Sequence, residues 1–196
     1  MQRIKVKLLN ITPSSVALAA ISKPYQNENP TKELFVKVAK TMKHESVLEH
    51  IYFSFDIDGI SRLCLQELAR HRIASLTVCS TRFTLQKMMK DKSTWDLSKY
   101  FVMPKCLTEQ ELRDYKHYLT EQVLQLNRFG YTIKNNDTLK YLLPESFRTS
   151  LVWTINARSL NNFFNLRMTH KAHFEIRYLA ELIYDLVSPM EYLFNE

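Results

Sequence analysis

Three cationic side chains stand together in this sequence of 196 residues, at Arg70, His71 and Arg72, and Ser80 and Arg82 follow soon after them. Two guanidinium groups beside an imidazole, with a hydroxyl and a third guanidinium nearby, form a surface suited to phosphates or to an electron-rich ring. Cations are also favourable at the C-terminal end of a helix, where they meet the negative end of its dipole. That effect needs only one or two cations, so the run of three exceeds what helix capping requires and leaves an anion-binding site open beside the dipole interaction.

The composition excludes several classes of protein. Hydrophobic residues make up 45% and charged residues 24%, which is typical of a folded globular chain and not of a disordered one. With only two glycines, the chain cannot contain a glycine-rich dinucleotide turn or a phosphate-binding P-loop. The net charge of +7 favours anionic partners, namely nucleic acid, a membrane surface or phosphorylated small molecules.

The cysteines and histidines indicate neither a disulfide framework nor a metal site. Cys64, Cys79 and Cys106 are odd in number and lack C-x-x-C spacing, so we expect a reducing, cytoplasmic location. The six histidines do not follow the spacing of zinc motifs, and we expect no metal. The longest uncharged run, residues 8–22, is too short and too polar to span a bilayer, so we expect no membrane partner.

Three segments, in matching order, resemble the flavin-dependent thymidylate synthases. The Arg-His-Arg of residues 70–72, with Ser80 after seven intervening residues, resembles the signature of that family. Upstream, residues 44–50 (HESVLEH) resemble its His-x-Thr/Ser-x-x-Glu-His segment. Downstream, residues 156–163 (NARSLNNF), with Arg167, resemble its Asn-Ala-Arg-Ser-Leu helix. The similarity extends over about residues 44 to 176.

The resemblance implies an FAD enzyme that converts dUMP to dTMP by reductive methylation at C5. Methylenetetrahydrofolate would supply the carbon and NADPH the electrons. Family members have an α and β fold and assemble as homotetramers whose subunits jointly build each site. A cationic cleft would concentrate these ligands, because every one of them is an anion.

The resemblance also assigns roles to residues. It implies FAD contacts at His44, Ser46, Glu49, Arg70, His71, Arg72, Ile73, Asn156, Arg158 and Asn162. It implies substrate contacts at Arg70, Ser80, Arg82, Lys140 and Arg167, and a catalytic role for Ser80 and Arg167. Arg167 would stabilise charge on a uracil oxygen. For Ser80 we expect hydrogen bonding and not covalent attack, because no base adjoins it in the sequence.

Three positions depart from the usual family pattern. Glu67 stands in place of a Gln, Val78 in place of a Glu, and Lys140 in place of an Arg, so that the charge at 140 is kept without the bidentate fork. We hypothesise that Glu67 supplies the carboxylate that Val78 does not, with both residues lining one nucleotide pocket. The departures leave open a paralogue that binds flavin and nucleotide but uses another substrate.

A basic nucleic-acid-binding protein is the alternative from a different class. The charge, with interleaved Tyr and Phe, would suit phosphate contacts and base stacking. No DNA- or RNA-binding motif is visible, so we expect no nucleic-acid partner.

Helices and strands must alternate to position these residues. Alternating apolar residues predict strands at 3–9 and at 52–58, with a turn at Gly59. Residues 149–155 are β-branched and apolar, which favours a strand there. Helical spacing predicts a helix from a Thr31 cap to about residue 43, and others at 61–72, 157–168 and 172–187. A long helix is predicted after the Thr108 and Glu111 capping box. Residues 75–84 are expected to be extended or loop, and residues 87–105 irregular.

We therefore predict a single α+β domain over residues 1–196, with a largely antiparallel sheet flanked by helices. Arg158 and Arg167 are nine residues apart on one predicted helix, about half a turn out of phase. That spacing predicts that the two arginines face opposite ways.

Overall fold

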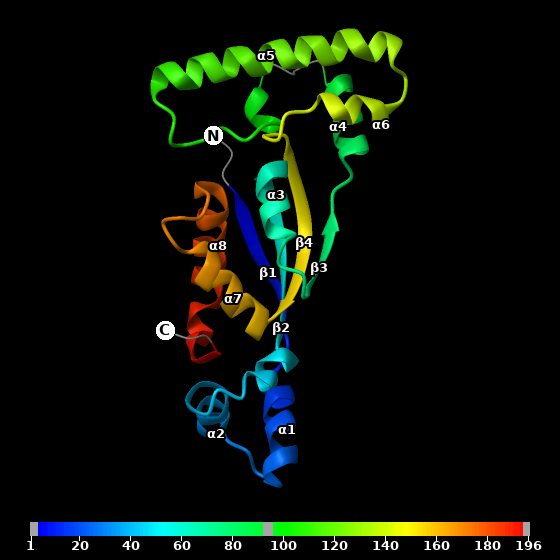
Figure 1. Ribbon diagram of the computed structural model, residues 1–196. Coiled ribbons are helices and arrows are strands. Elements are labelled where there is room, and N and C mark those ends of the chain that lie inside the picture. Colours follow the sequence, from blue (N-terminus) through cyan, green and yellow to red (C-terminus); the bar gives the residue numbers. More distant parts are fainter. Residues whose placement is uncertain (1–3, 92–95, 194–196) are drawn as a thin grey trace. The chain divides into compact units, whose positions relative to one another are not determined.

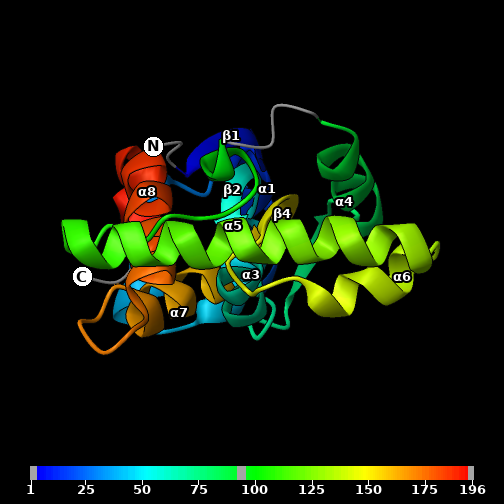
Figure 2. The same ribbon diagram turned by 90° about the horizontal axis from the view of Figure 1, so that it is seen from above.

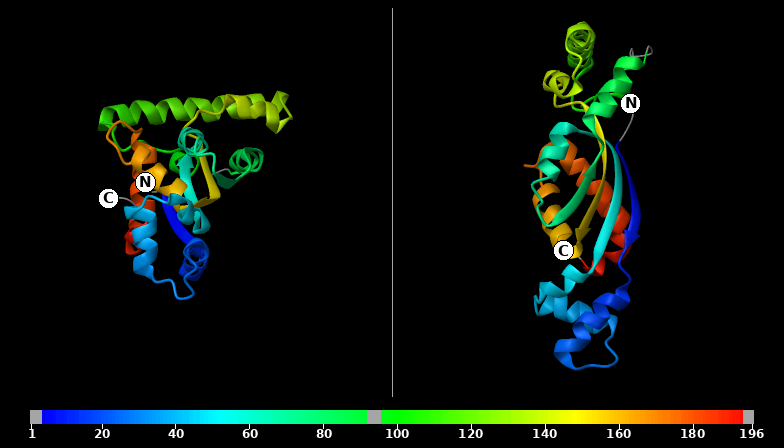
Figure 3. Two further views of the ribbon diagram at one scale, coloured as in Figure 1. Left: turned by 60° about the horizontal axis from the view of Figure 1, so that its bottom comes forward. Right: turned by 90° about the vertical axis from the view of Figure 1, so that its right-hand side faces the viewer.

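The computed structural model describes residues 4–91 and 96–193 (Figure 1). Its strands are β1 (Lys5–Ile11), β2 (Tyr52–Ser61), β3 (Ala74–Val78) and β4 (Arg148–Asn156). They form one antiparallel four-stranded sheet in the order β1-β2-β4-β3 (Figure 3). The predicted α+β class with an antiparallel sheet is confirmed.

Eight α-helices accompany the sheet in the described ranges: α1 (Ser14–Tyr25), α2 (Lys32–Val36), α3 (Arg62–Leu68), α4 (Thr81–Lys90), α5 (Glu109–Thr132), α6 (Asn136–Leu139), α7 (Ala157–Arg167) and α8 (Phe174–Val187). A π-helical turn at Lys37–Thr41 and 3₁₀ turns at Glu45–His50, Leu97–Lys99 and Lys140–Leu142 lie between these elements, and a 3₁₀ turn at Ser188–Leu193 follows α8. Within the described part of the chain, none of the helices combines the length and apolar character that a membrane crossing requires.

The chain forms two compact units, each built from separate stretches of sequence. Unit 1 comprises Asp58–Gln66 and the described residues between Val78 and Ser150, with Ile4. Unit 2 comprises Lys5–Ile57, Glu67–Thr77 and the described chain from Leu151 to Leu193. A single domain over residues 1–196 stays a prediction.

In unit 2, one face of the sheet is apolar and is covered by helices. On β2, Phe53, Phe55 and Ile57 alternate with more exposed residues and are completely buried, as the period of two requires. The Trp153 ring of β4 and the Phe163 ring of α7 pack in a T-shaped arrangement, with ring centroids 5.1 Å apart. Helix α8 lies against β1 (Figure 1). This packing fixes α7 on the sheet, so that its other face is free to build a site.

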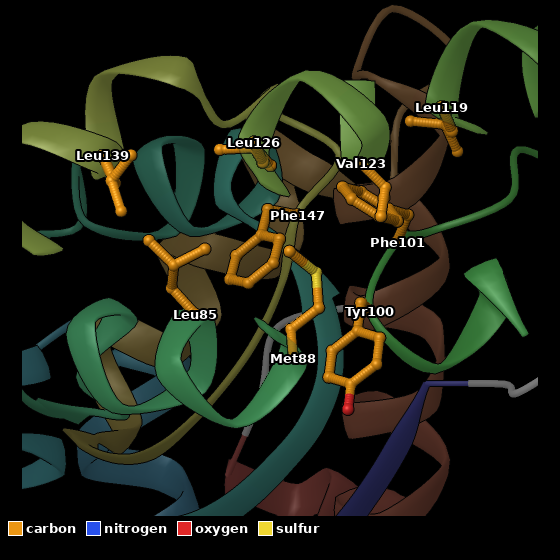
Figure 4. Packing of buried hydrophobic residues seen from close by; sticks show 9 residues of the cluster. All are labelled: Leu85, Met88, Tyr100, Phe101, Leu119, Val123, Leu126, Leu139 and Phe147. Atoms are coloured by element: carbon orange, nitrogen blue, oxygen red, sulfur yellow. The ribbon is translucent and has the colours of Figure 1, made fainter. Parts of the chain in front are cut away.

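Unit 1 has its own core around the long helix α5. Thr108 and Glu111 form the predicted capping box, and α5 presents Leu119, Val123 and Leu126 at helical spacing to a buried cluster. Figure 4 shows these side chains with Leu85 and Met88 of α4 and with Tyr100, Phe101, Leu139 and Phe147. Figure 2 shows α6 alongside α5, near α4. The cluster joins α4, α5 and α6 into one body.

The structure corrects two element boundaries near the predicted site. The predicted helix 61–72 ends at Leu68, and the His71 amide donates to the Leu68 carbonyl at 3.1 Å, so the cations of residues 70–72 follow the helix. The turn predicted at Gly59 is wrong, because β2 continues through it to Ser61. Gly59 has φ +88°, and a Cβ there would collide with the Arg148 guanidinium, so this strand position requires glycine.

Other stretches agree only in part with the prediction. Within residues 75–84, expected to be extended or loop, most of β3 is extended as expected, but α4 begins at Thr81. Residues 87–105, expected to be irregular, contain the end of α4 and a 3₁₀ turn. The sequence reasoning did not predict α1. The helix from Thr31 begins as predicted, with Thr31 Oγ1 accepting from the Leu34 amide at 3.2 Å, but it becomes a π-helical turn after Val36. Arg3 and residues 92–95 lie outside the described residues.

Candidate functional site

A pocket of about 880 Å³ in unit 2, here called the unit 2 pocket, brings together most of the predicted flavin residues. Three segments line it: residues 70–73 after α3, the 3₁₀ turn with Glu45 and Glu49, and one face of α7. The α7 residues are Arg158, Ser159, Asn161, Asn162, Asn165, Leu166 and Arg167. Four arginines and three asparagines give this pocket a cationic and strongly hydrogen-bonding wall.

Backbone and side-chain hydrogen bonds fix the start of α7. The Asn156 Oδ1 accepts from the Ser159 amide at 2.8 Å and caps the helix, and the Ala157 amide donates to the Ile51 carbonyl at 2.8 Å. Arg158 and Asn162, four residues apart, share one helix face, as predicted. Asn156 itself is buried as a cap and is not among the pocket-lining residues.

Two glutamates orient Arg158 at the pocket wall. Its Nη1 donates to Glu49 Oε1 at 2.6 Å, and its Nε donates to Glu45 Oε2 at 3.2 Å. The three side chains are between about one third and one half exposed, so these pairs add little to stability. Their effect is to hold the guanidinium plane beside the turn that carries the glutamates.

Arg167 is held at three points. Its Nη1 donates to Glu67 Oε2 at 2.6 Å, its Nη2 to the Glu67 carbonyl at 3.3 Å, and its Nε to His71 Nε2 at 3.1 Å. The Arg167 side chain is 16% exposed and that of Glu67 30%. A guanidinium with all three nitrogens engaged has one orientation, and that orientation is set by the segment 67–71.

His71 is neutral in this arrangement. Because its Nε2 accepts from Arg167, the proton of the neutral ring lies on Nδ1. Burial, followed by the positive charge of Arg167, lowers the pKa of His71 to about 4. The ring packs edge-on against Phe163, with centroids 4.9 Å apart. An uncharged imidazole therefore stands beside the guanidinium at neutral pH.

The prediction that Arg158 and Arg167 face opposite ways is wrong, because both line the unit 2 pocket. Arg167 is the last residue of α7, and its long side chain follows its partners Glu67 and His71 instead of the helical phase of its Cα. Glu67, expected to line a nucleotide pocket with Val78, engages Arg167 with its carboxylate. Val78 lines a different pocket, in unit 1.

That second pocket, of about 510 Å³ and here called the unit 1 pocket, contains the predicted residues Ser80, Arg82 and Lys140. Arg62, Leu65, Val78, Cys79, Thr81 and Asp137 complete its lining. Ser80 precedes α4, and its side chain does not cap the helix. The first-turn amides and the positive dipole end of α4 thus adjoin three cationic side chains, an arrangement that suits a phosphate.

Asp137 lies between two of these cations. Its Oδ2 accepts from Arg82 Nη1 at 3.3 Å, and its Oδ1 accepts from Lys140 Nζ at 3.0 Å. The hydrogen bond from Lys140, followed by the charge of Arg82, lowers the pKa of Asp137 below its ordinary value.

Comparison with known proteins identifies the family. The family model described as "Thymidylate synthase complementing protein" matches residues 7–190. A flavin-dependent thymidylate synthase of Wolinella succinogenes is 43% identical over 169 residues, which cover 83% of this chain and 80% of that protein. The chain belongs to the flavin-dependent thymidylate synthase family.

Other members of this family agree in sequence and in fold. The flavin-dependent thymidylate synthase of Helicobacter pylori strain 26695 is 38% identical over 200 residues, with 94% of both chains covered. A crystal structure of thymidylate synthase X from Helicobacter pylori, with FAD and dUMP, superposes with a TM-score of 0.84 at 34% identity and covers 98% of both chains. The family, enzyme class and fold expected from the sequence motifs are confirmed.

Some residues that family resemblance assigns to flavin lie apart from the unit 2 pocket lining. His44 is exposed, with its Nδ1 3.4 Å from the Tyr25 hydroxyl, and Ser46 is exposed on the 3₁₀ turn. Conversely, sequence reasoning did not name Asn165, which follows Asn162 by three residues on the lining face of α7, although helical spacing indicates it. Arg62 of the unit 1 pocket belongs to none of the three motifs, and no sequence signal pointed to it.

Proposed function

We propose that this member of the flavin-dependent thymidylate synthase family binds FAD and dUMP and converts dUMP to dTMP. Methylenetetrahydrofolate is the carbon donor and NADPH the electron donor in this proposal. The observation that carries it is the unit 2 pocket, which gathers Glu49, residues 70–73, Arg158 and Asn162 from three separate motifs. The Helicobacter pylori structure with FAD and dUMP supports the choice of ligands.

The unit 2 pocket fits FAD in size and in chemistry. Its volume lies in the range of small-molecule and cofactor sites. Arg70, Arg72 and Arg158 offer guanidinium groups to a diphosphate, and planar guanidinium groups also stack on aromatic rings. Asn162 adds an amide that both donates and accepts. When bound, the flavin supplies the hydride-transfer chemistry. His44, Ser46 and Asn156 stay in the proposal as flavin contacts on the family resemblance alone.

We infer that Arg167 acts on the nucleotide ring and that the chain holds it in place for this role. A fixed guanidinium stabilises negative charge on a uracil oxygen without having to reorient during the reaction. Glu67 and His71 supply the fixed geometry. Glu67 then contributes through Arg167, not as a direct nucleotide contact, and Arg70 remains a proposed contact of both ligands.

The unit 1 pocket is the proposed phosphate site for dUMP. Arg82 and Lys140 supply charge, the first-turn amides of α4 supply donors, and Ser80 supplies a hydroxyl. Ser80 binds the phosphate and is not a nucleophile in this proposal, since no basic group is among its described contacts.

Assembly and location complete the proposal. We infer a homotetramer whose subunits jointly build each site, on the family resemblance. A cytoplasmic location is supported by the odd number of cysteines, which favours a reducing compartment.

The test is flavin loading followed by turnover. The purified protein should be yellow or should take up added FAD, and should form dTMP from dUMP with methylenetetrahydrofolate and NADPH. Arg158→Ala should weaken FAD binding in an absorbance titration, because it removes a cation from the pocket wall. Arg113→Ala, at an exposed arginine of α5, is the matched control and should bind FAD as the parent does.

Three outcomes separate the alternatives. A colourless protein that cannot be loaded with FAD overturns the proposal. Binding of FAD and dUMP without dTMP formation favours the paralogue with another substrate. Equal loss of FAD in the Arg158 and Arg113 variants removes the assignment of the unit 2 pocket.

A further inference from the structure

The carboxylate of Asp137 lies among the cations of the unit 1 pocket. One of its oxygens accepts from Arg82 and the other from Lys140, at 3.3 and 3.0 Å. Arg82 and Lys140 are two of the side chains proposed to bind the nucleotide phosphate. Among the described residues that line this pocket, Asp137 alone is acidic. The carboxylate thus takes up two of the donors that a phosphate would use.

Local structure holds Asp137 in this place. Asn135 precedes α6 and accepts from the Asp137 amide with its Oδ1 at 2.8 Å, which anchors the backbone at the first turn. Lys140 follows Asp137 by three residues, whereas Arg82 comes from α4, 55 residues away in the sequence. The carboxylate therefore bridges a local cation and a distant one.

We propose that Asp137 is a built-in competitor for phosphate, which occupies Arg82 and Lys140 until a dianionic phosphate group displaces it. A phosphate has more charge and more acceptor oxygens than a carboxylate, and it can also reach donors that Asp137 does not use, such as the Ser80 hydroxyl and Arg62. Asp137 would thereby set the minimum charge that a ligand needs to enter. The inference rests on the proposed phosphate function of the unit 1 pocket.

Competition of this kind requires an ionised carboxylate at working pH. The hydrogen bond from Lys140 and the charge of Arg82 both favour the ionised form, and they lower the pKa of Asp137. The side chains of Asp137, Arg82 and Lys140 are between about two fifths and three fifths exposed, so each ion pair is weak and can be broken by a stronger anion.

The experiment compares Asp137→Asn with the parent, both loaded with FAD, by calorimetric titration. The substitution keeps the shape and removes the charge. The free energy needed for a phosphate to displace Asp137 is that of two exposed ion pairs, each of which is weak. We therefore expect dUMP and inorganic phosphate to bind the variant roughly two- to tenfold tighter. Uncharged deoxyuridine should show no such gain. Asp137→Ser provides a second neutral side chain, should the asparagine variant fold poorly.

Glu109→Gln on α5 is the matched control, because it makes the same change of net charge in unit 1 at a side chain that is 96% exposed. It should leave dUMP affinity unchanged. The competitor role is wrong if the Asp137 variants bind dUMP no tighter than the parent, or if the control gains as much. In both cases a parent that binds dUMP leaves the proposed pocket function intact. If neither parent nor variant binds dUMP or phosphate, the pocket function and the competitor role fail together.

Discussion

The hydrogen bonds that hold Arg167 to Glu67 predict a strong energetic coupling between these two residues. The perturbation is a double-mutant cycle of Glu67→Ala, Arg167→Ala and the double variant. In the parent, truncating Glu67 leaves a guanidinium that is only 16% exposed without its carboxylate. In the Arg167→Ala background the ion pair has already been lost, so the same truncation removes nothing further from it. Glu67→Ala should therefore cost far less in that background than in the parent.

The geometry of the ion pair sets the size of the expected loss of unfolding free energy. The 2.6 Å contact joins two charged groups that are both less than one third exposed, and hydrogen bonds to charged groups contribute about 1.5 to 3 kcal/mol. The bond from Nη2 to the Glu67 carbonyl survives the truncation, so we expect about 2 kcal/mol from Glu67→Ala and a coupling of similar size. For a chain of this length, that loss lowers the melting temperature by roughly 4 to 8 °C.

The assay is urea unfolding of the four proteins, followed by dUMP titration of the FAD-loaded forms. Glu67→Ala should weaken dUMP binding in the parent but not in the Arg167→Ala background, and Glu67→Gln should recover part of the loss. If the losses of unfolding free energy in the two single variants add up to that of the double variant within about 0.5 kcal/mol, Glu67 does not hold Arg167 in place. Glu67 would then be a direct nucleotide contact.

Three further predictions address the pH response, the core and the chemistry. The free energy of unfolding should fall as the pH drops from about 6.5 to about 4, because His71 takes up a proton in the unfolded chain but not in the folded one. The fall due to His71 should be on the order of 3 kcal/mol, and His71→Gln should remove it. Measuring the unfolding free energy of both proteins across this pH range tests the prediction. Phe147→Ala should cost about 3 to 5 kcal/mol in urea unfolding, since Phe147 is buried within the unit 1 cluster, and a loss below about 1 kcal/mol would contradict that packing. Cys79→Ala should still form dTMP, and a folded, flavin-loaded variant without turnover would indicate a thiolate nucleophile.

Elements with strong local signals could be predicted from the sequence. The capping box at Thr108 fixes the start of α5, because its hydrogen bonds are made within four residues. The alternation in β2 sets the buried face of the strand, and the spacing of Arg158 and Asn162 sets the lining face of α7. The three motifs also identified the family without the structure, because each is a short segment that is recognised from its residue types and spacing alone.

Boundaries that depend on distant contacts could not be predicted. Nothing local ends α3 at Leu68, because the next four residues contain neither Gly nor Pro. His71 is instead buried against Phe163, more than 90 residues further along the chain, and this contact requires the segment to leave the helix. Gly59 likewise has the sequence pattern of a turn, whereas its φ of +88° in the structure, beside the Arg148 guanidinium, explains a glycine inside a strand.

The sequence by itself determined which residue types are present and which of them share a helix face or a strand face. The tertiary structure decided how the charges are paired. Helical phase turns Arg167 away from Arg158, yet Glu67, 100 residues earlier, draws its side chain to the same pocket. Asp137 meets Arg82 across 55 residues in the same way. The direction of a long charged side chain depends on where the nearest opposite charge lies and on which of its atoms can be buried. Both depend on contacts between distant parts of the chain, so the periodicity of the sequence does not predict them.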